Sequence, residues 1–325
     1  MKIIKSISRM QNNINSFTKP VGLVPTMGSI HQGHIKLIQA SKKQNATTIV
    51  TLFINPIQFG ENEDFNKYPR NFQQDKKLLS SLGVDILFAP ETSRMYPREF
   101  QTNVINNQIS NTLEGAMRPT HFTGVSTVVS KLLNITKPNN AYFGQKDFQQ
   151  LLIINKLNND LNHGVKIVSI PTVRENDGLA LSSRNIYLNQ NEREAASKIY
   201  TSLKLAKDLY LNGELSSDSI INTIEEYLLK ESLIKIEYIS IRDKFTFDRE
   251  ITDGNKGLRI KAGSAPALGI GEPIGDAPQE SLFEFDLLVR NAVLLVKLSE
   301  LILVQFHLVG LGDVGRPFHQ GHPHQ

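Results

Sequence analysis

Two histidines, His31 and His34, lie three residues apart on either side of Gly33, in the segment PTMGSIHQGHIKLIQA. The chain has eight histidines in all. An apolar run ends at Pro25 and helical periodicity begins near Ile35, which places the pair on the first turn of a helix that follows a strand. The free N–H groups and partial positive charge of a helix N-terminus bind phosphate readily.

The residue types of this pair suit phosphate chemistry. Two imidazoles on one turn can hydrogen-bond the same phosphate as charge builds on it in a transition state, and Gly33 lets the backbone approach without a Cβ. We therefore expect His31 and His34 to hold a nucleoside triphosphate at its reacting phosphate. A helix cap beside a surface histidine is the alternative that four residues alone favour, because so short a pattern recurs by chance. The chain has no cysteine, which excludes a thiolate zinc site.

The elements that must position the pair are predicted from apolar runs that alternate with helical periodicity. Such alternation predicts a parallel, doubly wound α/β sheet with right-handed crossovers. Ligands bind these sheets outside the carboxyl ends of the strands, and the histidines follow the first predicted strand, so this context favours the phosphate site. We predict buried strands at 21–25, 47–54, 84–90, 140–144 and 165–171, and helices at 34–42, 72–82, 125–135 and 147–161.

The pattern changes after this sheet. Helical spacing over 192–211 and 218–231, followed by a strand-like run over 234–241, predicts a small α+β domain. We expect a ligand-binding α/β domain at 1–185, a small lid domain at 186–252 and an atypical tail at 253–325.

The tail opens with a run rich in Gly, Ala and Pro and ends with a histidine-rich sequence, for which a solvated, disordered tail is the favoured interpretation. Its apolar stretch at 287–306 is expected to be an isolated helix. The segment as a whole is expected to be foreign to the fold, and the alternative is that this helix stands in for the missing end of the second domain.

Composition narrows the class of partner. The net charge of +4 and the pI near 9.0 are only mildly basic, and Lys and Arg form no run of five, so a nucleic-acid surface is not indicated. No apolar stretch of membrane-spanning length occurs, and the N-terminus does not look like a signal peptide. Together with the lack of cysteine, these features favour a cytoplasmic protein that handles small anionic substrates.

Five longer motifs carry a more specific signal than the histidine pair. They are VPTMGSIHQGH, TLFINPIQFGENEDFNKYPR, EGAMRPTHFTGVSTVVSKLLNITKP, FGQKDFQQL and VRENDGLALSSRN. In this order and spacing, from the N-terminus to about residue 250, they resemble the pantothenate synthetase (pantoate–β-alanine ligase) family of the nucleotidyltransferase superfamily. The resemblance implies a Rossmann-like fold in which residues 1–185 bind ATP and pantoate. It also implies that pantoate and ATP form a pantoyl adenylate with release of pyrophosphate, and that β-alanine then gives pantothenate and AMP.

The resemblance also implies roles for particular residues. The catalytic residues would be His31, His34, Lys146 and Arg184. The residues that bind pantoate would be Gln58, Gln150 and Asn55. The ATP site would include, besides the catalytic positions, Met27, Gly144, Asp147, Val173, Leu181, Ser182 and Ser183, and further active-site positions would be Tyr68 and Arg118. ATP would be a substrate, with Mg²⁺ carried mainly by its phosphates, and the protein would be a homodimer.

Each motif taken alone has an ordinary structural interpretation. Asn55-Pro56 could end a strand, Lys146-Asp147 could begin a helix, and Ser182 to Arg184 could be a loop into the next helix. Gln149 and Gln150, on a predicted helix, would ordinarily be surface residues. Their coincidence in order favours the functional interpretation.

The resemblance weakens toward the C-terminus. The family's final helix, glycine turn and strand are not found after Asp253, so we expect the second domain to lack one strand of its sheet.

Two other functions stay open at this point. One is a nucleotidylyltransferase that moves a nucleotide onto a phosphorylated acceptor; the glutamines Gln58 and Gln150 argue against it, because they suit a carboxylate acceptor. The other is a nucleotide-binding regulator without turnover. ATP binding without pantoate-dependent AMP formation would favour the regulator.

Overall fold

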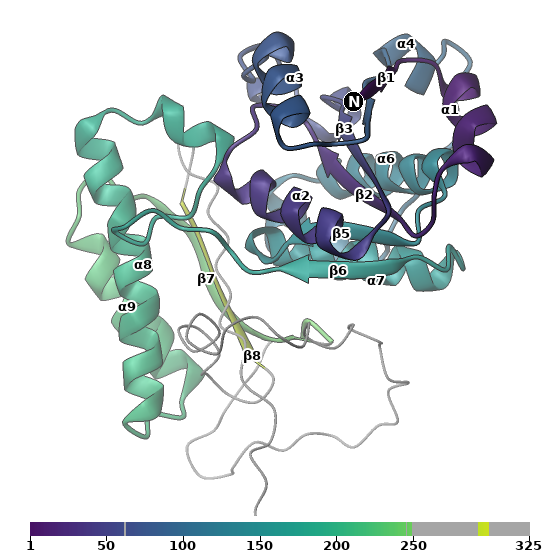
Figure 1. Cartoon of the computed structure of the whole chain (residues 1–325). Helices are drawn as coiled ribbons and strands as arrows, with labels where there is room; N and C mark the ends of the chain where they lie inside the picture. Colours follow the sequence, from purple (N-terminus) through teal and green to yellow (C-terminus); the bar gives the residue numbers. More distant parts are fainter. Residues whose placement is uncertain (62, 245, 249–291, 299–325) are drawn as a thin grey trace, which may run out of the picture.

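The computed structural model of this chain describes residues 1–61, 63–244 and 246–248 in full and residues 292–298 as backbone. Figure 1 shows a domain built around a six-stranded sheet, with a smaller lobe beside it. Among the described residues, no helix is long and apolar enough to cross a membrane.

The larger domain contains six parallel strands in the order β1-β4-β3-β2-β5-β6. Its inner strands are buried along nearly their whole length, as expected for parallel strands covered on both faces. The strands are β1 (Lys2–Ile4), β2 (Val21–Thr26), β3 (Thr47–Leu52), β4 (Ile86–Phe88), β5 (Asn140–Gly144) and β6 (Lys166–Ile170). This order confirms the predicted doubly wound α/β sheet. Strand β1 was not predicted, because it is only three residues long and too short to show a period.

Helices cover both faces of this sheet. Buried side chains of α1, α6 and α7 form the core on one face, and those of α2 and α3 form it on the other. The helices are α1 (Ile7–Asn13), α2 (Gln32–Gln44), α3 (Phe72–Ser81), α4 (Thr92–Met95), α5 (Glu114–Met117), α6 (His121–Thr136) and α7 (Phe148–Asp160). Short 3-10 turns are η1 (Ile14–Ser16), η2 (Pro56–Gln58), η3 (Asp64–Asn66), η4 (Ile109–Asn111), η5 (Gln145–Asp147) and η6 (Ser183–Tyr187).

The smaller lobe has its own apolar core, which joins two helices to a two-stranded sheet. These elements are α8 (Gln190–Leu211), α9 (Ser217–Leu229), β7 (Ile236–Asp243) and β8 (Ala292–Leu298). Figure 1 shows α8 and α9 side by side. The two helices and the strand expected after residue 186 are therefore present.

The expectation for the tail needs a correction. An isolated helix was expected over 287–306, but Ala292–Leu298 forms β8, which pairs antiparallel with β7. Val and Leu fill most of this segment, and β-branched Val suits a strand. The second domain was expected to lack one strand of its sheet, but β8 is present and pairs with β7. The rest of the predicted tail, residues 253–291 and 299–325, lies outside the described residues.

Candidate active site

One cavity opens at the carboxyl ends of the central strands. There β2 and β5 are neighbours, and the chain leaves them toward opposite halves of the sheet, which is the crevice where open α/β sheets bind ligands. Every site residue predicted from the sequence lines this cavity: Met27, His31, His34, Asn55, Gln58, Tyr68, Arg118, Gly144, Lys146, Asp147, Gln150, Val173, Leu181, Ser182, Ser183 and Arg184. The structure thus brings together side chains from motifs that are far apart in the sequence.

The histidine pair forms the first turn of α2. His31 is the N-cap, and its Nδ1 accepts a hydrogen bond from the Gly33 N–H at 3.1 Å. In return the His31 N–H donates to Nδ1 of His34 at 3.3 Å, which completes a capping box. A Cβ on Gly33 would lie 2.8 Å from Cε1 of His31, so glycine is needed here to make room for the imidazole. The alternative of a helix cap and the phosphate interpretation are therefore compatible, because the capping rings also line the cavity.

This geometry fixes the protonation of both rings. Each Nδ1 accepts a backbone N–H, so the proton of each neutral imidazole is on Nε2. Burial first, and then the charge of Lys146, lower the pKa of His31 to about 4. Burial, His31 and Lys146 lower the pKa of His34 to about 3. At neutral pH the pair therefore offers two uncharged Nε2–H donors.

The turn before the histidines is held by Asp75 of α3. Its carboxylate accepts the N–H groups of Ser29 and Ile30, each at 2.9 Å. Gly28 has φ +92° and Ser29 has φ 53°, both in the left-handed region, so the turn needs such fixed partners. Asp75 is buried and was not predicted as a site residue. Its contribution is to position the backbone that leads into the capping turn.

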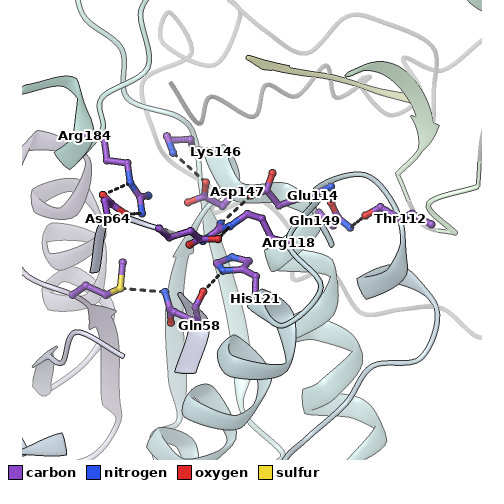
Figure 2. Close-up of polar contacts among 12 residues, drawn as sticks. Gln58, Asp64, Thr112, Glu114, Arg118, His121, Lys146, Asp147, Gln149 and Arg184 are labelled. Carbon is purple, nitrogen blue, oxygen red and sulfur yellow. Dashed lines mark hydrogen bonds and ion pairs between the residues drawn. The ribbon is translucent and has the colours of Figure 1, made fainter. Parts of the chain in front are cut away.

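The glutamine expected at the pantoate pocket lies at the end of η2, where α6 approaches closely. A Cβ on Gly124 of α6 would lie 2.4 Å from the Ile57 carbonyl oxygen and 2.5 Å from Cα of Gln58. The Gln58 carbonyl oxygen lies 2.9 Å from Nδ1 of His121, which must carry a proton there because a carbonyl only accepts. Gly124 and His121 thus fix the main chain of Gln58 (Figure 2).

Two arginines of the cavity are already engaged by acidic residues from one loop. Arg184 donates through Nε and Nη2 to both oxygens of Asp64, each at 2.9 Å. Arg118 donates to both oxygens of Glu63, and its Nη1 donates to Glu114 at 2.9 Å. Figure 2 shows Asp64 facing Arg184, with Arg118 and Glu114 nearby. Both arginine charges are therefore compensated in this structure.

These ion pairs set the pKa values of their members. Burial alone would lower the pKa of Arg184, but the hydrogen bonds that it donates to Asp64 raise the pKa above its ordinary value. Burial likewise would raise the pKa of the Asp64 carboxyl, but Arg184 holds it below its ordinary value. Asp64 is therefore charged at neutral pH. A phosphate that binds Arg184 must replace this carboxylate.

The remaining predicted residues lie around these groups. Lys146 contacts Asp147 at 3.1 Å on η5, directly after β5. Ser182 caps η6 by accepting the Arg184 N–H, and Ser183 donates to the Ser29 carbonyl oxygen at 3.3 Å, which ties the serine motif to the histidine turn. The structural interpretation of Ser182 as a loop residue that leads into a helix is thus also correct.

Of the two neighbouring glutamines, only one faces the cavity. Gln150 lines it, whereas Gln149 is fully buried and donates to the carbonyl oxygens of Ile109 and Thr112 (Figure 2). The ordinary expectation of surface glutamines is wrong for Gln149, which anchors the segment before α5.

Sequence reasoning did not single out Glu63, Asp64, Glu114 and His121, although the quoted motifs contain them. Glu63, Asp64 and His121 each contact a residue of another motif, so no local pattern marked them. The partner of Glu114 is Arg118, four residues further on in the same motif. Within residues 1–61, 63–244 and 246–248, no group of three or more His, Asp or Glu side chains gathers as metal ligands would.

Known proteins match this chain over the segment that contains the site residues. The model of the family described as pantoate-beta-alanine ligase matches residues 2–265. A pantothenate synthetase from Caldicellulosiruptor bescii is 47% identical over 251 residues, which cover 76% of this chain and 89% of that protein. One from Dehalococcoides mccartyi is 50% identical over 237 residues, which cover 73% of this chain and 88% of that protein.

Solved structures agree. The pantothenate synthetase of Thermus thermophilus superposes with a TM-score of 0.74 at 38% identity and covers 77% of this chain and 90% of that one. The pantoate-beta-alanine ligase of Francisella tularensis, solved with beta-gamma ATP and beta-alanine, gives a TM-score of 0.65 at 41% identity and covers 74% of this chain and 88% of that one.

Proposed function

This chain belongs to the pantoate–β-alanine ligase family and is an ATP-dependent ligase that forms pantothenate, and from this premise we propose how its residues divide the work. Adenylation converts the carboxylate of pantoate into an acyl group with AMP as leaving group, which an amine can displace. One cavity lined by a phosphate-binding turn, two glutamines and an apolar wall suits both steps.

ATP is placed with its phosphates at the first turn of α2. His31 and His34 direct neutral Nε2–H donors toward the α-phosphate, where negative charge builds as the carboxylate attacks. Lys146 and Arg184 complement the triphosphate charge, and Arg184 exchanges Asp64 for a phosphate as ATP enters. Ser182, Ser183, Asp147 and Gly144 complete the wall on this side.

Pantoate is placed between Gln58 and Gln150. These amides can hydrogen-bond its carboxylate and its two hydroxyls. Its two methyl groups need an apolar surface, and side chains of α6 and β5 supply one in the same cavity, namely Val125, Val128, Val129, Leu132 and Phe143.

The reaction then needs no bond to the enzyme. A pantoate carboxylate oxygen attacks the α-phosphorus of ATP, and the bond from that phosphorus to the bridging oxygen breaks, which releases pyrophosphate. The free amine of β-alanine next attacks the acyl carbon, the C–O bond to AMP breaks, and the nitrogen loses one proton to the departing AMP or to water. Arg118, which lines the same cavity, is suited to the carboxylate of β-alanine once that carboxylate replaces Glu63.

Mg²⁺ is proposed to be carried mainly by the phosphates. A triphosphate in transfer needs its charge neutralised. Among the residues that the structure describes, no three or more His, Asp or Glu side chains gather as metal ligands would, which favours the phosphates and water as the main ligands. Full activity in excess EDTA would contradict this. We also propose, from the family alone, that the protein is a cytoplasmic homodimer. Light scattering, which gives the mass in solution, tests the dimer.

The observation that carries this function is the meeting of the histidine turn with Lys146, Gln58 and Gln150 in one cavity. The test is AMP formation from ATP, pantoate and β-alanine by the full chain. AMP that needs both substrates supports the ligase. A nucleotidylyltransferase would instead release pyrophosphate with phosphopantetheine as acceptor, and a regulator would bind ATP without forming AMP.

A further inference from the structure

We propose that Tyr96 and Asn55 are positioning residues that hold the Gln58 amide with its NH₂ group toward the cavity, so that Gln58 acts on pantoate as a hydrogen-bond donor. This inference rests on the proposed pantoate site. It assigns Asn55 a different task from direct contact with pantoate, and it gives Tyr96, which lies outside the residues that line the cavity, a part in substrate recognition.

The series of hydrogen bonds starts at a backbone carbonyl oxygen, which can act only as an acceptor. The backbone carbonyl oxygen of Gly124, on α6, lies 3.0 Å from Nδ2 of Asn55. A carbonyl oxygen only accepts, so the nitrogen of the Asn55 amide must face it. The opposite orientation would put two oxygens in contact in a place where Asn55 is only 1% exposed, and water could not relieve the conflict.

The orientation of Asn55 then fixes that of Gln58. The second N–H of Asn55 Nδ2 is directed at Oε1 of Gln58, at 3.0 Å. Oε1 must be the acceptor in this contact, because a nitrogen there would set two donors against each other. Nε2 of Gln58 is therefore the atom left for the cavity, and it lies 3.1 Å from the sulfur of Met27. Figure 2 shows this contact at Gln58.

Tyr96 closes the chain from the other side. Its hydroxyl donates to Oδ1 of Asn55 at 2.7 Å. Tyr96 follows α4, and its ring packs near Phe53 and Phe100, with centroid distances of 6.0 and 5.0 Å. Burial raises the pKa of Tyr96 further above its ordinary value of 10.0, so the hydroxyl keeps its proton and remains a donor. The three side chains form one directed series from Tyr96 through Asn55 to Gln58.

This direction matches the substrate. The thioether of Met27 is a weak acceptor, so an oxygen of pantoate can replace it at Nε2 of Gln58 at little cost. Pantoate is an anion with a carboxylate, and a donor at this position favours it over an acceptor. An amide that could turn over would present a donor only part of the time.

The experiment is a double-mutant cycle in the full chain with Tyr96→Phe, Gln58→Ala and the double variant. Tyr96→Phe keeps the ring contacts and removes only the hydroxyl. We expect it to raise the pantoate KM about threefold to tenfold and to leave kcat and the ATP KM within about twofold of the wild type. In the Gln58→Ala background, Tyr96→Phe should leave the pantoate KM unchanged, because Tyr96 acts only through Gln58.

Gln58→Glu tests whether the side chain at this position must donate a hydrogen bond to pantoate. Its carboxylate can still accept from Asn55, but it presents a negative oxygen to pantoate. We expect Gln58→Glu to raise the pantoate KM more than Gln58→Ala does. A smaller increase than in Gln58→Ala would mean that Gln58 acts as an acceptor, and it would overturn the proposal.

Thr136→Val is the matched control. Thr136 is a buried residue on α6, the helix that carries Gly124, and its hydroxyl donates to the Leu132 carbonyl oxygen at 2.8 Å. The variant removes one buried hydroxyl from the same helix, so its pantoate KM should equal that of the wild type. Thermal unfolding of each variant shows whether it is folded.

The outcomes separate the two levels of the inference. An unchanged pantoate KM in Gln58→Ala overturns the pantoate site itself. A raised KM in Gln58→Ala, together with an equal effect of Tyr96→Phe in both backgrounds, leaves that site in place and overturns the positioning role.

Discussion

At His31 and His34, the Nδ1 atom of each ring caps the first turn of α2, and the Nε2 atom remains available to a ligand. The Nδ1 atoms complete the capping box of α2, and the protonated Nε2 atoms are free of that task. Local folding therefore selects the tautomer that the proposed phosphate contact needs. A helix cap made by Ser or Asp would satisfy the same backbone groups without supplying a second donor.

Replacing one of these rings should affect turnover more than substrate binding. We expect His34→Ala to lower kcat about a hundredfold, because one preorganised donor to developing charge contributes on the order of 3 kcal/mol. The pantoate KM should change little. Steady-state kinetics measure both constants. His163→Ala, at a partly exposed histidine near Ser130, is the control and should retain wild-type kcat. Equal losses in kcat and pantoate affinity would contradict the role given to His34.

The same rings predict how stability depends on pH. Their folded pKa values, about 4 and about 3, lie below the value of 6.5 for an exposed histidine. Between those values the unfolded chain binds more protons than the folded one, so the free energy of unfolding falls as pH drops below about 6.5. Denaturant titrations at pH 7.5 and pH 5 should show a smaller pH dependence in His34→Ala than in the wild type. The same pH dependence in both proteins would contradict the low pKa of His34.

At the scale of elements, the loop that carries η3 lies against two arginines of the cavity. Asp64 and Glu63 are adjacent in sequence but bind Arg184 and Arg118, which come from separate elements. Under the proposed function, ATP therefore has to displace Asp64 in order to bind Arg184.

Weakening that contact should strengthen ATP binding. In Asp64→Asn the carboxylate is lost, so Arg184 is more readily available, and we expect the Kd for Mg-ATP to fall about threefold to tenfold. Calorimetric titration measures it. Asp160→Asn removes the partner of Lys156 on the exposed face of α7 and should leave the Kd unchanged. Weaker ATP binding in Asp64→Asn would show instead that Asp64 holds Arg184 ready for the phosphate.

The sequence predicted the elements better than it predicted the contacts between them. The strand at 140–144 was predicted at its observed bounds, because a buried run between turn residues is a local signal. The strand expected at 84–90 is only Ile86–Phe88, since its ends depend on where β1 and β3 pair with it. The bonds of Asp75, Asp64 and Tyr96 could not be predicted, because each joins segments that only the tertiary fold brings together.

At the scale of the whole molecule, the two parts depend differently on the C-terminal segment. The sheet domain has cores on both faces of its own sheet. In the smaller lobe, β7 pairs with β8, which follows it by nearly fifty residues in the chain. The prediction that 253–325 is foreign to the fold therefore needs a test that treats β8 separately from the rest.

Two truncations make that test. Ending the chain after residue 252 removes β8, and ending it after residue 298 keeps it. We expect limited proteolysis to cleave the smaller lobe of the first variant well before that of the second, because β7 then has an unpaired edge. The sheet domain should resist in both. A chain ending at 252 that is as resistant as the full chain would support a dispensable tail.

Exchange of labelled pyrophosphate into ATP tests the central claim most directly, because it reports the adenylation step alone. We expect exchange that requires Mg²⁺ and pantoate and does not require β-alanine, with a higher pantoate requirement in Gln58→Ala. Exchange without pantoate, or pantothenate formed by an enzyme that shows no exchange with pantoate, would contradict a pantoyl adenylate formed in this cavity.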